Sequence, residues 1–115
     1  MQIIEAVIKP TKLDAVKTAL AELGILGMTA VECKGFGKQR GHSERYRGPK
    51  LDAGFVPKVL LKICVKPEDK EMAVKTLLTV ARTGQNGEIG DGKIFVYPVA
   101  EVYRVRTGEA GAAAV

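Results

Sequence analysis

Two stretches of this sequence repeat one another, and the repeat limits the folds that so short a chain can adopt. The first runs through Ile8-Lys9-Pro10 to Ala15-Val16-Lys17-Thr18, and the second through Val65-Lys66-Pro67 to Ala73-Val74-Lys75-Thr76. In each copy an apolar run typical of a strand precedes the Lys-Pro pair, and a helical pattern follows it. The matched order of these identities indicates a duplicated strand–helix unit.

Each copy also carries the signals that begin and end a helix. In the first, Pro10 ends the strand, Thr11 with Asp14 is a weak capping-box pattern, and Gly24 supplies the stop. Apolar residues recur at helical spacing at Leu13, Val16, Leu20 and Leu23. In the second copy the acidic residues 68, 69 and 71 suit a helix N-terminus, and the predicted buried stripe is Ala73, Leu77 and Val80.

Further strands are predicted at 28–34, 56–65 and 93–99, which gives the order strand, helix, strand, long loop, strand, helix, strand. Two βαβ units joined in this way predict one α+β domain over 1–115, a ferredoxin-like antiparallel sheet with both helices on one face. Within 58–65, the predicted helix-facing residues are Val59, Leu61, Ile63 and Val65, and the residues predicted on the opposite face are Lys58, Leu60, Lys62 and Cys64. Burying Leu60 on that second face requires a partner, and another copy of the chain is the economical choice.

The segment 35–55 is too long and too polar for a hairpin turn. Loops above about 12–15 residues are uncommon in compact domains and are usually functional or disordered. The glycines Gly35, Gly37 and Gly41 around Lys38 would let the backbone approach an anionic ligand closely. We therefore expect the base of this loop to bind a ligand and its tip to report on it.

A second glycine-rich stretch, 83–93, matches the first seven positions of a P-loop from Gly87 to Lys93. The Mg²⁺-binding Ser or Thr of that motif is replaced by Ile94, and a strand pattern follows instead of a helix, so a P-loop fold is not expected. Two interpretations stay open. The backbone amides of the turn bind phosphate with Lys93 as counter-charge, or the stretch is a connection without a ligand.

The third stretch contains Arg104 and Arg106, which would share one face of an extended segment. Two guanidinium groups on one face can converge on a single polyphosphate. The remaining residues, 110–115, are expected to form a frayed tail.

The formal net charge is +5, and between Lys34 and Lys62 eight basic side chains are opposed only by Glu44 and Asp52. A small polyanion such as a nucleotide polyphosphate explains both the charge and the glycines. Nucleic-acid binding is the less favoured alternative, because few aromatic residues interleave with the basic ones.

No apolar run approaches the roughly 20 residues of a membrane span, and no signal-peptide pattern opens the chain. Cys33 and Cys64 lie in apolar runs and are expected to be buried reduced thiols, with a redox pair or metal site as the alternative. These features predict a cytoplasmic protein.

From Ile3 to Glu109 the chain resembles the PII signal-transduction (nitrogen regulatory) proteins. The blocks that carry the resemblance are Ile8-Lys9-Pro10, residues 34–42, Tyr46-Arg47-Gly48, Pro57-Lys58-Val59, Ala81-Arg82-Thr83-Gly84, residues 89–96 and residues 104–109. The resemblance implies a non-enzymatic homotrimer with nucleotide sites between subunits. There ATP and ADP compete, and 2-oxoglutarate joins Mg-ATP in most members. It also implies a T-loop, here about 37–55, that docks on a target protein such as an ammonium transporter or a regulatory enzyme.

The resemblance further implies a set of nucleotide-binding positions, which are Thr29, Gly35, Gly37, Lys38, Gln39, Cys64, Gly90, Asp91, Gly92, Lys93, Arg104 and Arg106. Among them, Thr29 and Cys64 would lie near the adenine, and the two arginines would reach in from the neighbouring subunit. Gln39 would ligate Mg²⁺ beside 2-oxoglutarate, and Lys58 would pair with a carboxylate of that acid.

The chain departs from the family pattern at several positions. Leu51 and Pro49 stand where relatives carry a modifiable tyrosine or serine, so those modifications are not possible here. Lys62 stands at a usually acidic position of the cleft, and the second glycine loop is longer than usual around residues 85–87. A divergent member is therefore expected, with the nucleotide site kept and the output changed. The alternatives are a PII-like sensor of another metabolite or transporter (carbon, urea or metal related) and a slow ATPase. Direct membrane contact is not expected.

Overall fold

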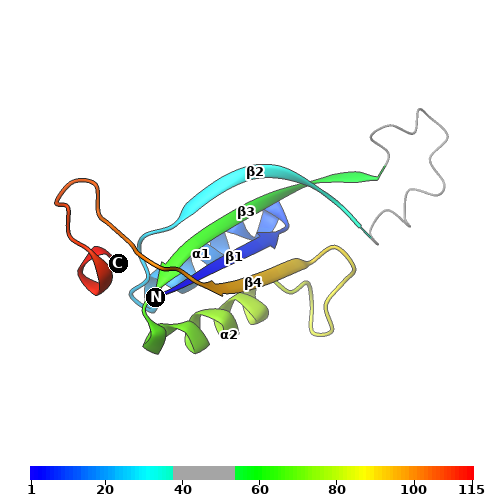
Figure 1. The fold of residues 1–115 in the computed structure, drawn as a ribbon. Helices are drawn as coiled ribbons and strands as arrows, with labels where there is room; N and C mark the ends of the chain where they lie inside the picture. Colours follow the sequence, from blue (N-terminus) through cyan, green and yellow to red (C-terminus); the bar gives the residue numbers. More distant parts are fainter. Residues whose placement is uncertain (38–53) are drawn as a thin grey trace.

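The computed structural model describes residues 1–37 and 54–115 (Figure 1). The strands are β1 (Gln2–Ile8), β2 (Thr29–Phe36), β3 (Phe55–Val65) and β4 (Gly92–Pro98), and the helices are α1 (Leu13–Glu22) and α2 (Lys70–Val80). Short 3₁₀ helices at Pro10–Lys12 and Pro67–Asp69 precede α1 and α2, and another follows at Gly111–Ala114. This is the predicted order of elements. The sequence repeat is visible in the structure, because each copy places a 3₁₀ helix directly before its α-helix.

The four strands form one antiparallel sheet in the order β2-β3-β1-β4. Both helices cover the same face of this sheet, which confirms the ferredoxin-like prediction (Figure 1). The predicted alternation in β3 is also confirmed, because its buried apolar residues are Val59, Leu61, Ile63 and Val65. These side chains pack with Val16 and Leu20 of α1 and with Ala73 and Leu77 of α2. Lys58, which is on the opposite face, is buried as well. Among the described residues, no helix is long and apolar enough to cross a membrane.

The helix starts differ from the prediction. The N-cap of α1 is Lys12, which makes no side-chain capping bond, so the expected Thr11–Asp14 capping box is wrong. The reason is that Pro10 opens a 3₁₀ turn that takes Thr11 inside it, and the Leu13 amide donates to the Pro10 carbonyl. The C-terminal signal is confirmed, since Gly24 follows α1 with φ of +87°.

The long loop is shorter than predicted because β2 and β3, the strands that flank it, extend further along it. Phe36 pairs with Phe55 in the β2–β3 ladder, and their ring centroids lie 5.2 Å apart. Gly35 is therefore a strand residue opposite Val56, not a loop residue. The remainder of the predicted T-loop, 38–53, lies outside the described residues.

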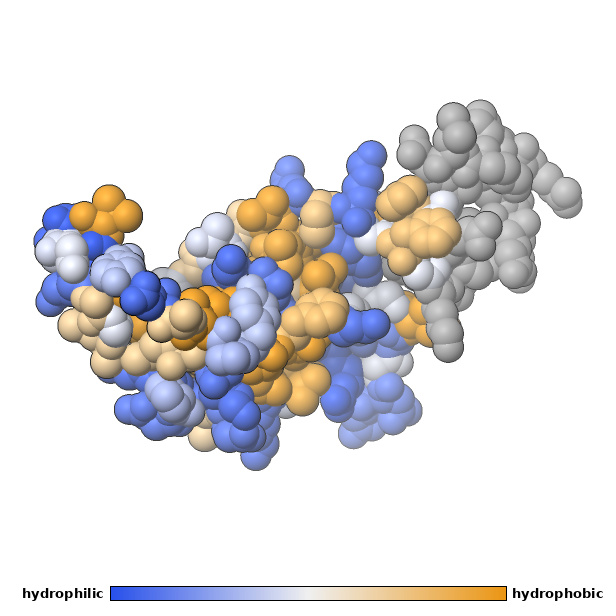
Figure 2. All heavy atoms as spheres, viewed as in Figure 1, coloured by the Kyte–Doolittle hydropathy of each residue, from blue (hydrophilic) through white to orange (hydrophobic). Residues whose placement is uncertain are grey.

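The face of the sheet away from the helices is partly open and apolar. Val31 of β2 and Phe95 and Tyr97 of β4 are exposed, and Leu60 of β3 is half-buried. Figure 2 shows hydrophobic residues gathered across the middle of the molecule in this view. The cysteines Cys33 and Cys64 are half-buried free thiols, so the expected full burial is wrong. Each is on a strand, and strand alternation places both on the same face as Leu60.

Candidate functional site

A cavity of about 680 Å³ opens at the end of the sheet where β2 ends and β4 begins. Its lining contains predicted site residues from three separate parts of the chain: Gly35, Gly37, Lys58, Gly90, Asp91, Gly92 and Lys93. Strand register explains why these parts of the chain lie together. Antiparallel pairing places both Gly92 of β4 and Val59 of β3 opposite Ile8 of β1. The remaining apolar lining includes Val7, Phe36 and Phe95.

Residues 83–91, the glycine-rich stretch before β4, are called the glycine loop. Gly92 sets the path of the chain from this loop into β4. Its φ is +110°, a conformation that residues with a side chain rarely adopt. A Cβ atom at this position would lie 1.7 Å from the carbonyl oxygen of Val7. Only glycine therefore fits here, and the close approach of the loop to β1 depends on it.

Lys58 joins the two glycine segments that line the cavity. Its stem packs against Gly35, where an added Cβ would lie 3.0 Å from the lysine Cγ, and its ammonium donates to the Gly90 carbonyl. The side chain is buried, and this desolvation, together with the nearby Lys9, lowers the pKa of Lys58. A cation thus lies in the cavity wall between the two glycine segments.

Asp91 organises the glycine loop from within. One of its carboxylate oxygens accepts hydrogen bonds from the backbone amides of Thr83 and Glu88, both at 2.9 Å, and the other accepts from the Thr83 hydroxyl at 2.6 Å. Burial alone would raise the pKa of Asp91, but these donors and Lys9 hold it well below its usual range. The residue predicted to contact phosphates and ribose is therefore engaged with its own chain on both oxygens.

Lys9 completes this network and was not singled out as a site residue by sequence reasoning. Its ammonium donates to the Thr83 hydroxyl and to Glu88 Oε1, both at 2.9 Å, and lies 3.3 Å from Asp91 Oδ1. These partners, Glu88 first, raise the pKa of Lys9 despite partial burial. The only sequence feature that could have indicated Lys9 is its position in one copy of the repeated Lys-Pro pair. That pattern does not indicate partners more than 70 residues away.

The donor set of this cavity suits an anion with several oxygen atoms. Lys93 is exposed at the start of β4, and the loop before it contains glycines with positive φ at Gly87 and Gly90. Turns of this kind can direct backbone amides and a lysine at a phosphate. Lys38 and Gln39, the other predicted ligands of phosphate and Mg²⁺, lie outside the described residues.

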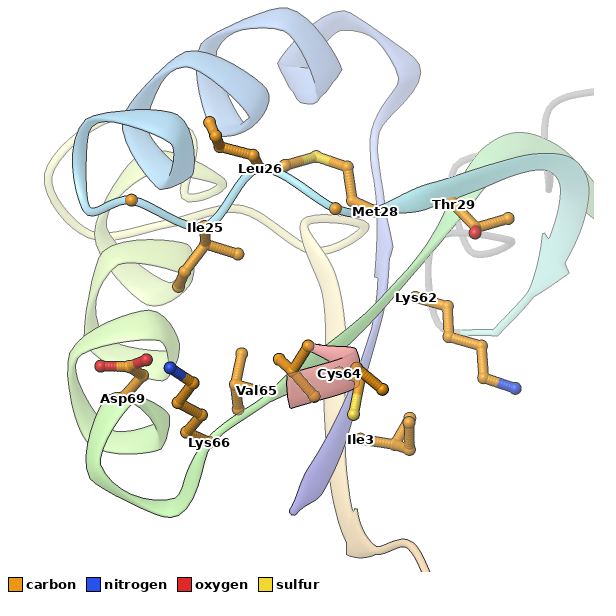
Figure 3. Close-up of a pocket in the computed structure, with 14 residues that line it drawn as sticks. Ile3, Ile25, Leu26, Met28, Thr29, Lys62, Cys64, Val65, Lys66 and Asp69 are labelled. Carbon is orange, nitrogen blue, oxygen red and sulfur yellow. The ribbon is translucent and has the colours of Figure 1, made fainter. Parts of the chain in front are cut away.

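A second cavity, of about 490 Å³, lies at the opposite end of the sheet. Thr29 and Cys64 line it together with Lys62, and apolar residues such as Ile25 and Met28 form much of its wall (Figure 3). Burial raises the pKa of the Cys64 thiol. Ala114 and Val115 also line this cavity, so the tail that the sequence predicts to fray contributes a 3₁₀ helix and part of a wall.

Arg104 and Arg106 line neither cavity. The Arg104 guanidinium donates to Glu109 at 3.0 Å, and the Gly108 amide donates to the Arg104 carbonyl at 2.7 Å. Arg106 lies in the turn that this bond closes, so the expected extended segment is wrong. The hairpin projects beyond the end of β4 remote from Gly92 (Figure 1).

The predicted site residues that the structure describes therefore fall into a glycine-lined cavity, a second cavity at the far end and an arginine hairpin. A family model described as "Nitrogen regulatory protein P-II" matches residues 1–109. "Nitrogen regulatory protein P-II 1" of Escherichia coli strain K12 is 53% identical over 115 residues, all of both chains. "Nitrogen regulatory protein P-II" of Klebsiella oxytoca is 53% identical and that of Azospirillum brasilense 51% identical, again over the full length of both chains. The chain belongs to the nitrogen regulatory protein P-II family.

Proposed function

We propose that this chain is a trimeric signal-transduction regulator of nitrogen metabolism that binds ATP and ADP. The observation that carries the proposal is the 680 Å³ cavity, in which the glycine loop, Lys58 and Lys93 come together. In this proposal Gly35, Gly37 and residues 90–93 hold the phosphates, with Lys93 as the exposed counter-charge. Lys38 and Gln39 add to the set at the base of the T-loop.

The separation of the two cavities supports a site shared between copies. Thr29 and Gly35 are six residues apart on β2, which at the usual strand rise is about 20 Å. In the proposed site the base therefore contacts Thr29 and Cys64 of one copy, and the phosphates contact the glycine-lined cavity of another. Arg104 and Arg106, which lie at the Thr29 end, would reach the phosphates of that neighbouring cavity. The open apolar sheet face is the surface that copies would bury on assembly.

The proposed response passes through the T-loop. Mg²⁺ would be held by the phosphates and Gln39, and 2-oxoglutarate by Gln39 and Lys58. Because Lys58 donates to the Gly90 carbonyl, ligand binding there would exchange an internal hydrogen bond for one to the ligand. The T-loop, at about 37–55, would then present a different surface to a cytoplasmic target, either an ammonium transporter or a regulatory enzyme.

Calorimetric titration of the full chain with ATP, ADP and 2-oxoglutarate, each with and without Mg²⁺, tests the proposal. We expect ATP and ADP to compete for one site per chain, and light scattering to give three chains per particle. Lys93→Ala should weaken both nucleotides, whereas Lys75→Ala on the exposed side of α2 should weaken neither. A monomeric particle or the absence of nucleotide binding would contradict the proposal, and strongly salt-dependent binding to DNA or RNA would favour a nucleic-acid role instead.

A sensor of another metabolite is the second candidate, and Lys62 is the observation that favours it. Its ammonium is exposed at the cavity that contains Thr29 and Cys64, so a positive group lies at a position where the family pattern is usually acidic. Binding of ATP without any 2-oxoglutarate signal at saturating Mg-ATP would favour this alternative. We propose that the chain has no enzymatic activity. Release of phosphate from ATP at many turnovers per minute would contradict this proposal.

A further inference from the structure

Glu88 differs from the other charged residues of the glycine-lined cavity. The cavity contains two lysines, Lys58 and Lys93, and two acids, Asp91 and Glu88. Asp91 is 19% exposed in its side chain, and both of its oxygens accept hydrogen bonds from the chain. The Glu88 side chain is 58% exposed, and within the described residues its carboxylate is paired only with Lys9. Its charge is therefore the less compensated of the two.

The single ammonium of Lys9 has to serve both carboxylates. It lies 2.9 Å from Glu88 Oε1 and 3.3 Å from Asp91 Oδ1. One positive and two negative charges leave this group of three residues with a net negative charge. Lys58 and Lys93, which also line the cavity, add two positive charges, so an anion entering the cavity is attracted by the lysines and repelled by Glu88.

We propose that Glu88 is a charge-discriminating residue, which weakens the binding of an anionic ligand to this cavity more as the ligand's charge increases. This inference rests on the proposed function, because it concerns the same nucleotide site. The physical reason is that Coulomb repulsion grows in proportion to the ligand's charge. ATP carries one more negative charge than ADP when neither is bound to metal. Glu88 thus reduces the preference for ATP over ADP that the lysines alone would create.

The contacts of Glu88 allow its charge to be removed without dismantling the loop. The bond to Asp91 uses the backbone amide of Glu88, and the Asp91 amide donates to the Glu88 carbonyl at 3.1 Å. Neither bond involves the Glu88 side chain. Asp91 would also keep Lys9 and Thr83 as partners. Glu88→Gln therefore changes the charge at the cavity and preserves the backbone turn.

The test is calorimetric titration of the full chain with ATP and ADP, without divalent cations and at low salt. The Glu88 charge is exposed and partly screened, so its removal in Glu88→Gln should tighten ATP binding only about two- to fivefold. The gain for ADP should be smaller, and both gains should shrink at high salt. Glu88→Asp, which keeps the charge, should stay close to the parent chain. Glu71→Gln, which removes an exposed glutamate paired with Lys70 on α2, should change neither affinity.

The outcomes separate this inference from the proposed function. If the parent chain binds both nucleotides and Glu88→Gln gains nothing, or gains equally for ATP and ADP, the role of Glu88 is overturned and the nucleotide site stands. If neither the parent chain nor any variant binds a nucleotide, both are overturned. A larger gain for ATP that Glu88→Asp does not reproduce supports the inference.

Discussion

At the residue scale, the glycine loop is held by contacts that leave little freedom of substitution. Gly92 fits because a carbonyl of β1 occupies the space of its missing Cβ, and Asp91 fits because its oxygens satisfy two amides and a hydroxyl. Both residues were predicted as ligand contacts. The structure adds that each also has a strong reason to be present without any ligand.

Gly92→Ala should therefore destabilise the fold and not merely the binding of a ligand. The added Cβ would meet the Val7 oxygen at 1.7 Å in a backbone conformation with φ of +110°, so β1 or β4 has to move. We expect a loss of about 3 kcal/mol or more in the free energy of unfolding, measured by urea titration. Gly27→Ala is the matched control, because nothing lies within 4 Å of the position that its Cβ would take and its φ is not positive. Equal effects of the two substitutions would contradict the assignment.

Asp91→Asn should lower stability near neutral pH, since the amide cannot replace a carboxylate that accepts three hydrogen bonds and faces Lys9. We expect a loss of about 1–3 kcal/mol. The folded pKa is depressed below the ordinary value of 3.8, so the stabilisation is present above that pH and is lost as pH falls below it. Urea titrations of both proteins at pH 7 and at pH 2.5 should show the difference shrinking in acid. A difference that grows in acid would contradict this account.

At the element scale, the parts that the sequence predicts well are those specified by local spacing. The repeat predicts both strand–helix units because apolar spacing and the stop at Gly24 act within one element. The errors arise where an element depends on a distant partner. Phe36 is in β2 because Phe55 pairs with it, and Arg106 is in a turn because the Gly108 amide bonds to Arg104. The Lys9 network joins residues more than 70 positions apart, which no local pattern can indicate.

The buried stripe of α2 provides a test at this scale, because two neighbouring leucines have opposite environments. Leu77 is 0% exposed in the core, whereas Leu78 is 49% exposed. Leu77→Ala should cost about 2–5 kcal/mol in the free energy of unfolding, because it opens a cavity that the sheet cannot fill. Leu78→Ala should cost less than about 1 kcal/mol. Circular dichroism followed through urea unfolding measures both, and comparable losses would show that the helix face has been assigned wrongly.

At the scale of the whole molecule, the two cavities explain why one chain is not sufficient for the proposed site. The glycine-lined cavity and the Thr29 cavity lie at opposite ends of one sheet, and the arginine hairpin lies at the Thr29 end. The family resemblance implies that the arginines come from a neighbour. The separation extends this expectation to Thr29 and Cys64, because they are on the same side as the hairpin. Nucleotide binding would thus depend on the assembly of the chains as well as on the nucleotide concentration.

This arrangement predicts complementation between two defective chains. Lys93→Ala impairs the phosphate half of the proposed site, and Thr29→Arg obstructs the base half, so neither variant alone should bind ATP well. In trimers mixed from equal amounts of the two, about one quarter of the interfaces would pair the intact halves if mixing is random. Calorimetry after co-refolding should therefore recover binding at about that fraction of sites. Simple mixing without subunit exchange serves as the control and should recover nothing. If both halves came from one chain, each chain in the mixture would still carry its own defect and co-refolding would recover no sites.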